Sequence, residues 1–271
     1  MKKDRLQNTK ITLLISTYNW KEALSLVLLS AARQTVFPHE IIIADDGSTS
    51  DTKETIDGLR SRIPIPIKHI WHEDQGFRKC TILNKALAYA EGDYIIEIDG
   101  DIVMEEHFIE DHLELMEHGY YVCGSRTKLL PQSTDRLLQG TSPTVKIRDM
   151  KLGDMLNSLR SKFARRFLSK RYGQRLDHMR GCNFAFWRSD FIRVNGYNED
   201  FVGWGYEDSE LVFRMHFAGC KKKFLKMGGV GYHLYHPEAS RNRATENKKK
   251  MNEAFKKCSQ RCLNGIDQYL L

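Results

Sequence analysis

Two carboxylates separated by one glycine, Asp99-Gly100-Asp101, end an apolar run in the first half of the chain. The run itself, residues 94–98, is typical of a buried strand that stops at a loop. Side chains two residues apart in extended backbone point the same way, so both carboxylates could face one ion, and Gly100 leaves room for a ligand beside the backbone. Hard oxygen ligands suit Mg²⁺ or Mn²⁺ held jointly with substrate phosphates. On these residues alone an acidic turn is the alternative, because Asp-Gly is a common turn dipeptide.

The elements that must position this pair alternate between strand and helix. Continuous apolar runs predict strands, and apolar residues three and four positions apart predict helices. The predicted strands cover residues 11–15, 40–44, 65–70 and 94–98, and the predicted helices cover 20–34, 51–61 and 80–91. Strands that are apolar throughout and alternate with helices predict an α/β fold with a mostly parallel central sheet flanked by helices.

A polar cluster follows each predicted strand, at residues 16–19, 45–48, 73–78 and 99–101. In sheets of this kind, ligands bind beyond the carboxyl ends of the strands. Four polar clusters at the same edge of one sheet therefore indicate a nucleotide-type site.

The second half of the chain carries a strongly basic stretch between about residues 130 and 178. A helix over 105–119 and a strand over 120–124 are predicted before it. Apolar residues then interleave with arginines and lysines, which predicts an amphipathic basic helix over about 156–175. Its apolar residues are Leu156, Leu159, Phe163, Phe167 and Leu168. We favour a solvated helix whose apolar stripe packs on the core. The alternative is contact with an anionic membrane surface or an anionic acceptor.

Composition and charge restrict the possible classes of protein. The chain has 271 residues, of which 41% are hydrophobic and 28% charged, and a net charge of +7. This composition is that of a folded protein, and the positive charge suits an anionic substrate or surface. No stretch approaches the roughly 20 apolar residues that cross a bilayer, and the first residues lack the pattern of a signal peptide. The six cysteines show only a weak metal-type pair, Cys258 and Cys262, so we expect reduced thiols in a cytosolic protein.

Five short motifs occur in an order that resembles a known family. They are Ile15-Ser-Thr-Tyr-Asn19, Ala44-Asp-Asp-Gly-Ser48, Gln75-Gly-Phe-Arg78, Asp99-Gly-Asp101 and Gly203-Trp-Gly-Tyr-Glu-Asp208. Each motif is short, but their joint order and spacing are specific. The chain resembles a family-2 glycosyltransferase of the GT-A fold over about residues 10–240. Its later part is similar to the galactosyltransferase-like region of chondroitin-polymerase-type and β-1,4-galactosyltransferase-type enzymes.

The resemblance implies a UDP-sugar donor bound at the strand ends. Residues 17–19 would pack the base, with the tyrosine ring as a stacking surface. Asp45 or Asp46 would accept a hydrogen bond from the uracil imide, with the other carboxylate near the ribose. Gln75 and Arg78 would approach the sugar or the diphosphate, because a guanidinium fits phosphate oxygens. The implied donor-binding residues are Thr17, Tyr18, Asn19, Asp45, Asp46, Gln75, Arg78, Asp99 and Gly100. Asn84 would brace this loop from the following helix.

The resemblance also implies a bound Mn²⁺ or Mg²⁺. Asp99 and Asp101 match the family's pair of aspartates, which hold a divalent ion that bridges the nucleotide diphosphate and neutralises the leaving group. A third ligand is expected towards the end of the chain, where His233 matches the family position and His236 is the reserve. Imidazoles suit Mn²⁺ better than Mg²⁺.

Glu207 and Asp208 supply the other half of the implied chemistry. Inverting transfer needs a base that removes the acceptor hydroxyl proton while the oxygen attacks the anomeric carbon. Asp208 matches the catalytic base, and Glu207 would orient the acceptor. Acidic residues at a helix start are otherwise explained by capping and the helix dipole. The implied acceptor-binding residues are Asn183, Trp204 and Glu207, whereas Trp187 is expected in the core.

These expectations describe an inverting, metal-dependent glycosyltransferase that moves a sugar from a UDP-sugar to a glycan or lipid-linked acceptor in bacterial surface polysaccharide synthesis. We expect one domain over residues 1–271, with a nucleotide-sugar-binding half (10–125), an acceptor and catalytic half (126–240) and a helical C-terminal extension (241–271). The protein would be cytoplasmic, with peripheral contact to the inner membrane surface and no nucleic-acid partner.

Two alternatives come from other classes. A sugar nucleotidyltransferase is disfavoured, because residues 16–19 do not form the glycine-rich, arginine-containing loop typical of those enzymes. A nucleotide-sugar-binding protein without catalysis is disfavoured, because the metal carboxylates and the base are present. The transferred sugar, the acceptor and the linkage do not follow from the sequence.

Overall fold

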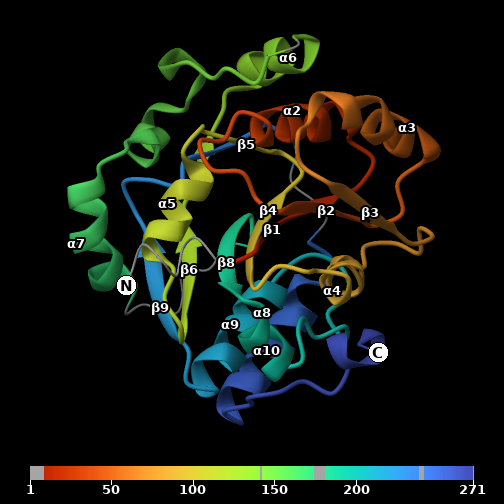
Figure 1. The fold of residues 1–271 in the computed structure, drawn as a ribbon. Coiled ribbons are helices and arrows are strands. Elements are labelled where there is room, and N and C mark those ends of the chain that lie inside the picture. Colours follow the sequence, from red (N-terminus) through yellow and green to blue (C-terminus); the bar gives the residue numbers. More distant parts are fainter. Residues whose placement is uncertain (1–8, 141, 174–180, 238–240, 271) are drawn as a thin grey trace.

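A seven-stranded mixed sheet lies at the centre of the protein (Figure 1), in a computed structural model that describes residues 9–140, 142–173, 181–237 and 241–270. Its strands are β1 (Ile11–Thr17), β2 (Glu40–Asp45), β3 (Ile67–Trp71), β4 (Tyr94–Asp99), β6 (Tyr120–Gly124), β8 (Asn183–Trp187) and β9 (Lys221–Leu225). They are ordered β3-β2-β1-β4-β8-β6-β9, and β8 alone among them runs against its neighbours. The predicted mostly parallel α/β sheet is confirmed.

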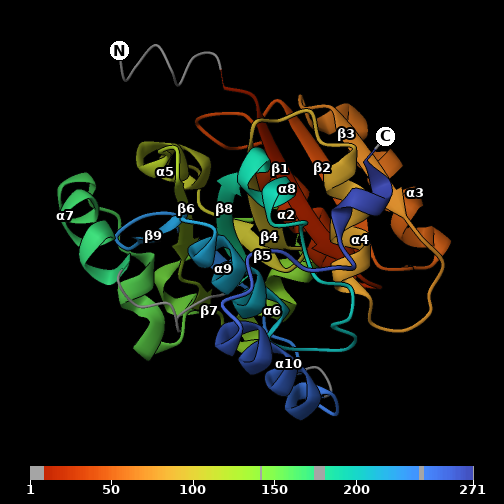
Figure 2. The same ribbon diagram turned by 90° about the horizontal axis from the view of Figure 1, so that it is seen from below.

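Helices cover both faces of this sheet (Figures 1 and 2). On one face lie α2 (Lys21–Ala31), α3 (Ser50–Leu59) and α5 (Phe108–Leu115). On the other lie α4 (Lys79–Ala88), α8 (Arg188–Arg193), α9 (Glu207–Phe217), α10 (Ala244–Lys256) and the 3₁₀ turn η4 (Ile266–Tyr269). The C-terminal extension therefore contributes Met251 and Ile266 to the core, and α10 packs on α9.

Strand β1 shows why the central strands are apolar throughout. Leu13 and Ile15 enter the core beneath α2 and α3, whereas Leu14 enters the core beneath α4, because successive side chains of a strand point to opposite faces. All three side chains are fully buried. Each contributes about 1.5–3 kcal/mol relative to an exposed position.

A small three-stranded sheet lies beside the end of β4. It consists of β5 (Ile102–Met104), β10 (Gly231–His233) and β7 (Thr127–Lys128), in that order. Strand β10 pairs antiparallel with β5 and parallel with β7. None of these three strands was predicted, because two or three residues are too short to show a periodicity.

Several predicted boundaries shift. The helix predicted over 105–119 is the shorter α5, because Glu105 still donates its amide to Val230 O at 3.0 Å and so continues β5. Asn183, expected to bind the acceptor, begins the buried strand β8. The remaining elements are α6 (Pro131–Gln139), α7 (Lys162–Gly173) and the 3₁₀ turns η1 (Arg60–Arg62), η2 (Ile147–Asp149) and η3 (Leu152–Ser158).

The basic stretch does not pack as we favoured. Phe163 and Phe167 of α7 are 88% and 70% exposed, so the expectation of an apolar stripe against the core is wrong for this helix. The side chain turned inwards is Arg165, which is fully buried and pairs with Asp111 (2.8 Å) and Glu114 (2.6 Å) of α5. The end of the predicted basic helix, at 174–175, lies outside the described residues. None of the helices in the described part of the chain has the length and apolar character of a membrane span.

Candidate active site

The carboxyl ends of β1, β2 and β4 meet at one edge of the large sheet. In the strand register, Thr17 lies opposite Asp45, and Ser16 lies opposite Asp99. The amide of Asp46 donates to Thr17 O at 3.0 Å and links the two loops that follow β1 and β2. The polar clusters predicted after these strands therefore lie together.

The Asp99 carboxylate is held by a hydroxyl and an ammonium group. Ser16 Oγ donates to Asp99 Oδ1 at 3.0 Å, and Lys79 Nζ forms an ion pair with the same oxygen. Burial opposes ionisation of Asp99, but the attraction of Lys79 outweighs it and lowers the pKa of this carboxyl. Asp99 is therefore an ionised carboxylate with a protein cation beside it.

Gly100 lies against the backbone of β1. Its amide donates to Ser16 O at 2.7 Å, and a Cβ at this position would come within 2.8 Å of the same oxygen. A side chain would therefore force the loop away from the strand. From the sequence, glycine at position 100 was expected to leave room for a ligand. In the structure, glycine is needed there because the loop contacts the backbone of β1.

Asp101, His233 and His236 bring their side chains together although more than 130 positions separate the aspartate from the histidines. The pairing of β5 with β10 is the cause, because it places His233 beside Ile102, and the amide of Leu234 donates to Asp101 O at 3.0 Å. Asp101 Oδ2 lies 3.1 Å from His236 Nε2 and 3.5 Å from His233 Nε2.

This cluster has the ligands that a divalent transition metal prefers. The three ligand atoms lie within 4.8 Å of one another, and Asp101 Oδ1 is buried without a hydrogen-bond partner in the structure. Burial lowers the pKa of His233, which favours the neutral imidazole that a metal needs. The hydrogen bond to Asp101 raises the pKa of His236. Two imidazoles and one carboxylate fit Mn²⁺ and leave positions for other oxygen ligands.

The cluster differs from the predicted metal set in two ways. It contains both histidines, so the choice between His233 and His236 does not arise in this geometry. It does not contain Asp99, whose carboxylate is paired with Lys79. Of the two aspartates, Asp101 alone clusters with both histidines.

Glu207 and Asp208 begin α9, and their carboxylates are fixed by backbone amides. Asp208 Oδ2 accepts from Gly181 N at 2.9 Å, and its Oδ1 accepts from Ser209 N at 2.6 Å. Glu207 Oε2 accepts from Gly205 N at 3.0 Å. Tyr206 precedes them with a φ of 72°, a left-handed conformation that turns the chain sharply into the helix.

Asp208 shares one site with the Asp99 loop. A Cβ built on Gly181 would lie 3.7 Å from Asp208 Oδ2 and 3.8 Å from Glu97 Oε1, so Asp208 and β4 face each other across this glycine. Burial raises the pKa of Glu207 to about 7, and the negative charges of Asp208 and Asp99 add to that rise. The carboxylates of the two chain segments therefore act on each other.

Glu97 is a buried carboxyl behind the site that sequence reasoning missed. It is fully buried on β4, accepts a hydrogen bond from Tyr197 OH at 2.8 Å, and leaves its Oε2 without a partner in the structure. Burial raises its pKa to about 8, with Asp99 and Asp208 contributing in the same direction. A charged residue inside the apolar run 94–98 was the available signal.

The residues expected to pack a base lie at the end of β1. Tyr18 is 51% exposed, and its hydroxyl donates to Asp74 Oδ2 at 2.8 Å. Asn19 has a φ of 47° and accepts the amide of Thr49 on its side-chain oxygen, so it ties β1 to the start of α3. Trp71, at the end of β3, is also half exposed and donates its ring nitrogen to Ser48 O. Two aromatic rings are thus available beside the loop after β2.

Asp45 and Asp46 are both buried and already paired. Asp45 accepts from Ser48 N at 2.8 Å and contacts His69 Nε2 at 2.9 Å. Asp46 contacts His72 Nε2 at 2.7 Å and accepts from Arg78 N at 2.9 Å. Burial raises the pKa of Asp46.

The loop before α4 places Gln75 and Arg78 differently. Gln75 is exposed. The Arg78 guanidinium is partly buried and donates to Glu73 O at 2.8 Å. Asn84 lies further along α4 and is fully buried, with hydrogen bonds to Tyr197 and Glu199, so it braces the 197–199 loop and not the 75–78 loop as expected.

Asn183 does not reach the site as an acceptor contact. Its side chain is fully buried, accepts from His112 at 2.8 Å and donates to Ser125 O (2.7 Å) and Gly229 O (3.0 Å). The expected acceptor contact is therefore contradicted, since an amide with these partners fastens β8 to the loops around it. Trp204 is 39% exposed, with Arg241 over its ring, and remains available.

Comparison with known families identifies the protein class. The model for glycosyl transferase family 2 matches residues 12–194, more than half of the chain. The chain belongs to glycosyltransferase family 2. A second model, described as the N-terminal domain of galactosyltransferase, matches residues 162–237 of this glycosyltransferase, which confirms the resemblance of its later part.

Curated relatives of the glycosyltransferase are longer proteins. Chondroitin synthase of Escherichia coli is 25% identical over 255 residues, which are 84% of this chain and 35% of the synthase. Validoxylamine A glucosyltransferase of Streptomyces hygroscopicus subsp. limoneus is 25% identical over 228 residues, which are 77% of this chain and 48% of that protein. The glycosyltransferase therefore spans about a third to a half of the length of these two relatives.

Solved structures confirm the GT-A fold of the glycosyltransferase. S. aureus TarS superposes with a TM-score of 0.61 at 16% identity, over 90% of this chain and 39% of TarS. The mannosyltransferase PcManGT from Pyrobaculum calidifontis, in complex with GDP-Man and Mn²⁺, superposes with a TM-score of 0.59 at 16% identity, over 90% of this chain and 62% of that protein.

Two cations at the site of the glycosyltransferase were also missed. Lys79 pairs with Asp99, and only its place beside Arg78 in the sequence marked it. Arg126 follows β6, and its positive charge opposes protonation of both His233 and His236, so it lies beside the cluster of Asp101 and the two histidines. Its Nε is buried without a hydrogen-bond partner in the structure. No local sequence signal distinguished Arg126 from other arginines of the basic second half.

Proposed function

We propose that this glycosyltransferase is an inverting, metal-dependent enzyme that moves a sugar from a UDP-sugar to a glycan or lipid-linked acceptor. The observation that carries the proposal is the meeting of two groups of residues at one site. Glu207 interacts electrostatically with Asp99, and Asp208 faces Glu97 of the same strand across Gly181. Asp99 in turn lies two residues from Asp101, which clusters with His233 and His236.

Asp208 is the proposed catalytic base. Its Oδ2 accepts one backbone amide and keeps a further lone pair, so it can take the proton of an acceptor hydroxyl as that oxygen attacks the anomeric carbon. Glu207, whose pKa is raised to about 7 by burial and by Asp208, is the proposed acceptor-orienting group. Trp204, half exposed four positions before Asp208, supplies an aromatic surface for a sugar ring.

Asp101, His233 and His236 are the residues that would hold Mn²⁺ or Mg²⁺. The ion, when bound, neutralises charge on the diphosphate leaving group. Arg126 lies beside the cluster as a cation of the protein itself, and a guanidinium suits phosphate oxygens. Lys79 holds Asp99 in position at the same edge.

A nucleotide sugar is the proposed donor. Structural neighbours support this class, because the TarS 1–349 fragment was solved with UDP and with UDP-GlcNAc, and PcManGT was solved with GDP-Man. We propose UDP as the nucleotide, bound between the residue 17–19 loop and the Asp45–Asp46 turn, with Gln75 and Arg78 towards the sugar or diphosphate. The identity of the sugar is the quantity that the experiment below determines.

The acceptor and setting follow from relatives alone. Chondroitin and hyaluronan synthases among the curated relatives are polysaccharide synthases by name. We therefore propose a role in bacterial surface polysaccharide synthesis, for a single-domain enzyme in the cytoplasm with peripheral contact at the inner membrane face. Family membership favours glycosyl transfer over a sugar nucleotidyltransferase.

A donor screen tests the proposal. The purified protein is incubated with Mn²⁺ and each of UDP-glucose, UDP-galactose, UDP-GlcNAc and UDP-GalNAc, with GDP-mannose as the control nucleotide sugar, and nucleotide release by slow hydrolysis is measured. We expect release from a UDP-sugar that stops when the metal is chelated. Binding of UDP without release from any donor would support the alternative of a catalytically silent binding protein, and preferred release of GDP would overturn the choice of UDP.

A further inference from the structure

A run of large apolar side chains is left on the surface between residues 147 and 167. These side chains belong to η2, η3, the linker after η3, and α7, and each is about half exposed or more. They are Ile147, Leu152, Leu156, Leu159, Phe163 and Phe167. Scattered single apolar residues are normal on a protein surface, but six within 21 consecutive positions make an apolar patch along the chain that favours an interaction partner.

The patch lies at the outer edge of the molecule. In Figures 1 and 2, α7 is the outermost helix on its side, beyond β9 and α5, and the segment that leads to it runs along the same edge. Phe163 and Phe167 are four positions apart on α7 and therefore project from one face of that helix.

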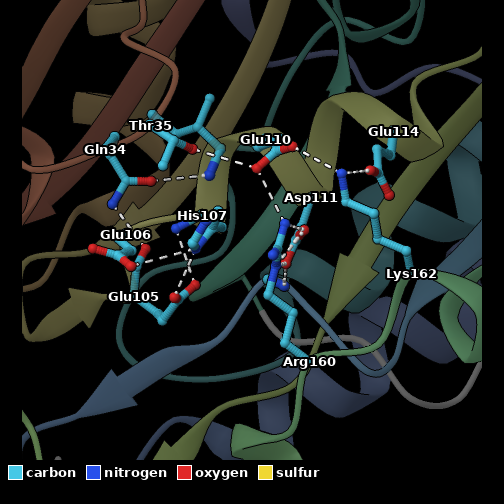
Figure 3. Close-up of polar contacts among 12 residues, drawn as sticks. Gln34, Thr35, Glu105, Glu106, His107, Glu110, Asp111, Glu114, Arg160 and Lys162 are labelled. Carbon is cyan, nitrogen blue, oxygen red and sulfur yellow. Dashed lines mark hydrogen bonds and ion pairs between the residues drawn. The ribbon is translucent and has the colours of Figure 1, made fainter.

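This helix is firmly attached, so the exposure of its phenylalanines is built into the fold. Arg160 donates to Glu110 and Asp111, and Lys162 contacts Glu110 and Glu114 at 3.1 Å each (Figure 3). Together with the buried Arg165, these ion pairs fix one side of α7 to α5. The opposite side carries Phe163 and Phe167.

Exposed basic residues alternate with the apolar residues of the patch along the chain. Lys146, Arg148, Lys151, Arg166 and Arg171 are all exposed. None of the five forms an ion pair with a carboxylate in the part of the chain that the structure describes. Two acidic residues lie between positions 146 and 171: Asp149 is buried and pairs with Arg136, and Asp154 lies on η3. The apolar side chains are therefore interspersed along the chain with positive charges that no carboxylate among the described residues pairs with.

We propose that this basic apolar surface, formed by the six apolar and five basic residues just named, docks the enzyme on an anionic lipid bilayer. Apolar side chains that enter the boundary between headgroups and acyl chains, with basic side chains among the anionic headgroups, are the two attractions that hold peripheral proteins on membranes. A second copy of the chain is a poorer occupant, because a two-fold contact through this surface would set its arginines and lysines against themselves.

The surface also adjoins the active site. Asn157 of η3 donates to Arg126 O at 3.3 Å and accepts from Lys226 at 2.7 Å. Strand β7, which packs on η3, pairs with β10 and its metal-cluster residue His233. Docking would thus hold the acceptor side of the site near the membrane, and this one consequence rests on the proposed lipid-linked acceptor.

Vesicle co-sedimentation tests the docking independently of any activity. The full chain is mixed with phosphatidylcholine vesicles with or without about a third of phosphatidylglycerol, at low salt and at high salt. We expect binding to the anionic vesicles, little binding to the neutral ones, and weaker binding as salt screens the charges. The double variant Phe163→Ala/Phe167→Ala should bind about tenfold more weakly, since each phenyl group loses its insertion into the bilayer.

Matched controls separate this surface from the general positive charge. Tyr89→Ala removes an aromatic side chain that is 63% exposed elsewhere, and should leave vesicle binding unchanged. Arg166→Glu/Arg171→Glu should weaken binding more than Lys248→Glu/Lys249→Glu, which makes the same charge change on α10. Thermal unfolding checks that every variant is folded. Equal vesicle binding by the parent chain and the double phenylalanine variant would overturn the proposal, and so would a dimer in solution that this variant dissolves.

Discussion

Lys79, the first residue of α4, pairs its ammonium group with the carboxylate of Asp99, the last residue of β4. Both side chains are mostly buried, at 18% and 28% exposure. The attraction of Asp99 overcomes the effect of burial and raises the pKa of Lys79, so the pair is ionised. The positive charge of Lys79 thereby offsets part of the negative charge at a site that also contains the carboxyl groups of Glu97, Glu207 and Asp208.

A double-mutant cycle on this pair should show strong coupling. Lys79→Met and Asp99→Asn are each expected to lower the free energy of unfolding by about 1–3 kcal/mol, because each leaves a buried group without its partner. The double variant should lose less than the sum, as measured by urea denaturation. The exposed pair Lys53–Asp57 on α3 is the control and should couple by less than about 0.5 kcal/mol. Additive losses at Lys79 and Asp99 would contradict the pairing.

Asp208→Asn should separate donor binding from transfer. The amide side chain retains the size of the aspartate and can still accept from Gly181 N, but it cannot take a proton at neutral pH. We expect transfer to fall by roughly 10² to 10⁴ and UDP affinity, measured by calorimetry, to stay the same. Near-normal transfer would reassign the base, with Glu207 as the next residue to test.

Removing a ligand of the metal cluster should weaken metal-dependent UDP binding. Asp101→Ala and His236→Ala are each expected to reduce UDP affinity in the presence of Mn²⁺ by about tenfold or more. The larger reduction is expected for Asp101→Ala. His107→Ala is the matched control, since His107 lies with Glu105 and Glu106 in a second cluster of possible ligands (Figure 3), which follows the end of β5 opposite to Asp101. If UDP binds the parent protein equally well with and without Mn²⁺, the ion has been placed wrongly.

Glu207 should make stability depend on pH with a definite sign. Its folded-state pKa is raised to about 7 by burial and by Asp208, above the ordinary value of 4.5. The folded protein therefore binds the proton more tightly than the unfolded chain, and this contribution is present at low pH and is lost as pH rises towards and above 7.

The variant Glu207→Gln should remove this dependence. Relative to the parent protein, its free energy of unfolding should improve between about pH 5 and about pH 8, because the parent alone must ionise a buried carboxyl over that range. Urea denaturation at the two pH values measures the difference. Glu22→Gln makes the same change at an exposed position of α2 and should give parallel curves. If the free energies of unfolding of the parent and Glu207→Gln differ by the same amount at every pH, the raised pKa assigned to Glu207 is wrong.

Asn183→Ala should act on stability. The substitution removes the partner of the buried Gly229 carbonyl, the buried His112 and the part-buried Ser125 carbonyl, which is expected to cost about 2–4 kcal/mol of unfolding free energy. Asn252→Ala, at an exposed position of α10, should change stability by less than about 0.5 kcal/mol. A variant with unchanged stability and a raised acceptor KM would restore the acceptor contact that burial argues against.

The sequence by itself determined the class of the fold and the edge at which the site lies. Four apolar runs, each followed by a polar cluster, predicted the parallel strands β1 to β4, and their continuous hydrophobicity reported burial on both faces. Asp99 and Asp101 were proposed as site residues because Gly100 and the preceding apolar run marked a loop after a buried strand, whereas Asp208 was proposed because its motif resembles that of the family. These signals are local, and local spacing is what a sequence displays directly.

Only the tertiary structure decided which distant residues meet. The pairing of β5 with β10 brings Asp101 next to both histidines, and the packing of α4 against the sheet brings Lys79 next to Asp99. Neither contact produces a periodic pattern in the sequence. The tertiary structure also decided which side chains are exposed. Asn183 is buried in the antiparallel strand β8. Phe163 and Phe167 are exposed because the opposite face of their helix carries Arg165, which forms buried ion pairs with Asp111 and Glu114. An amphipathic pattern shows that a helix has an apolar face and a polar face. Which of the two packs against the rest of the protein depends on the side chains that the fold places next to the helix.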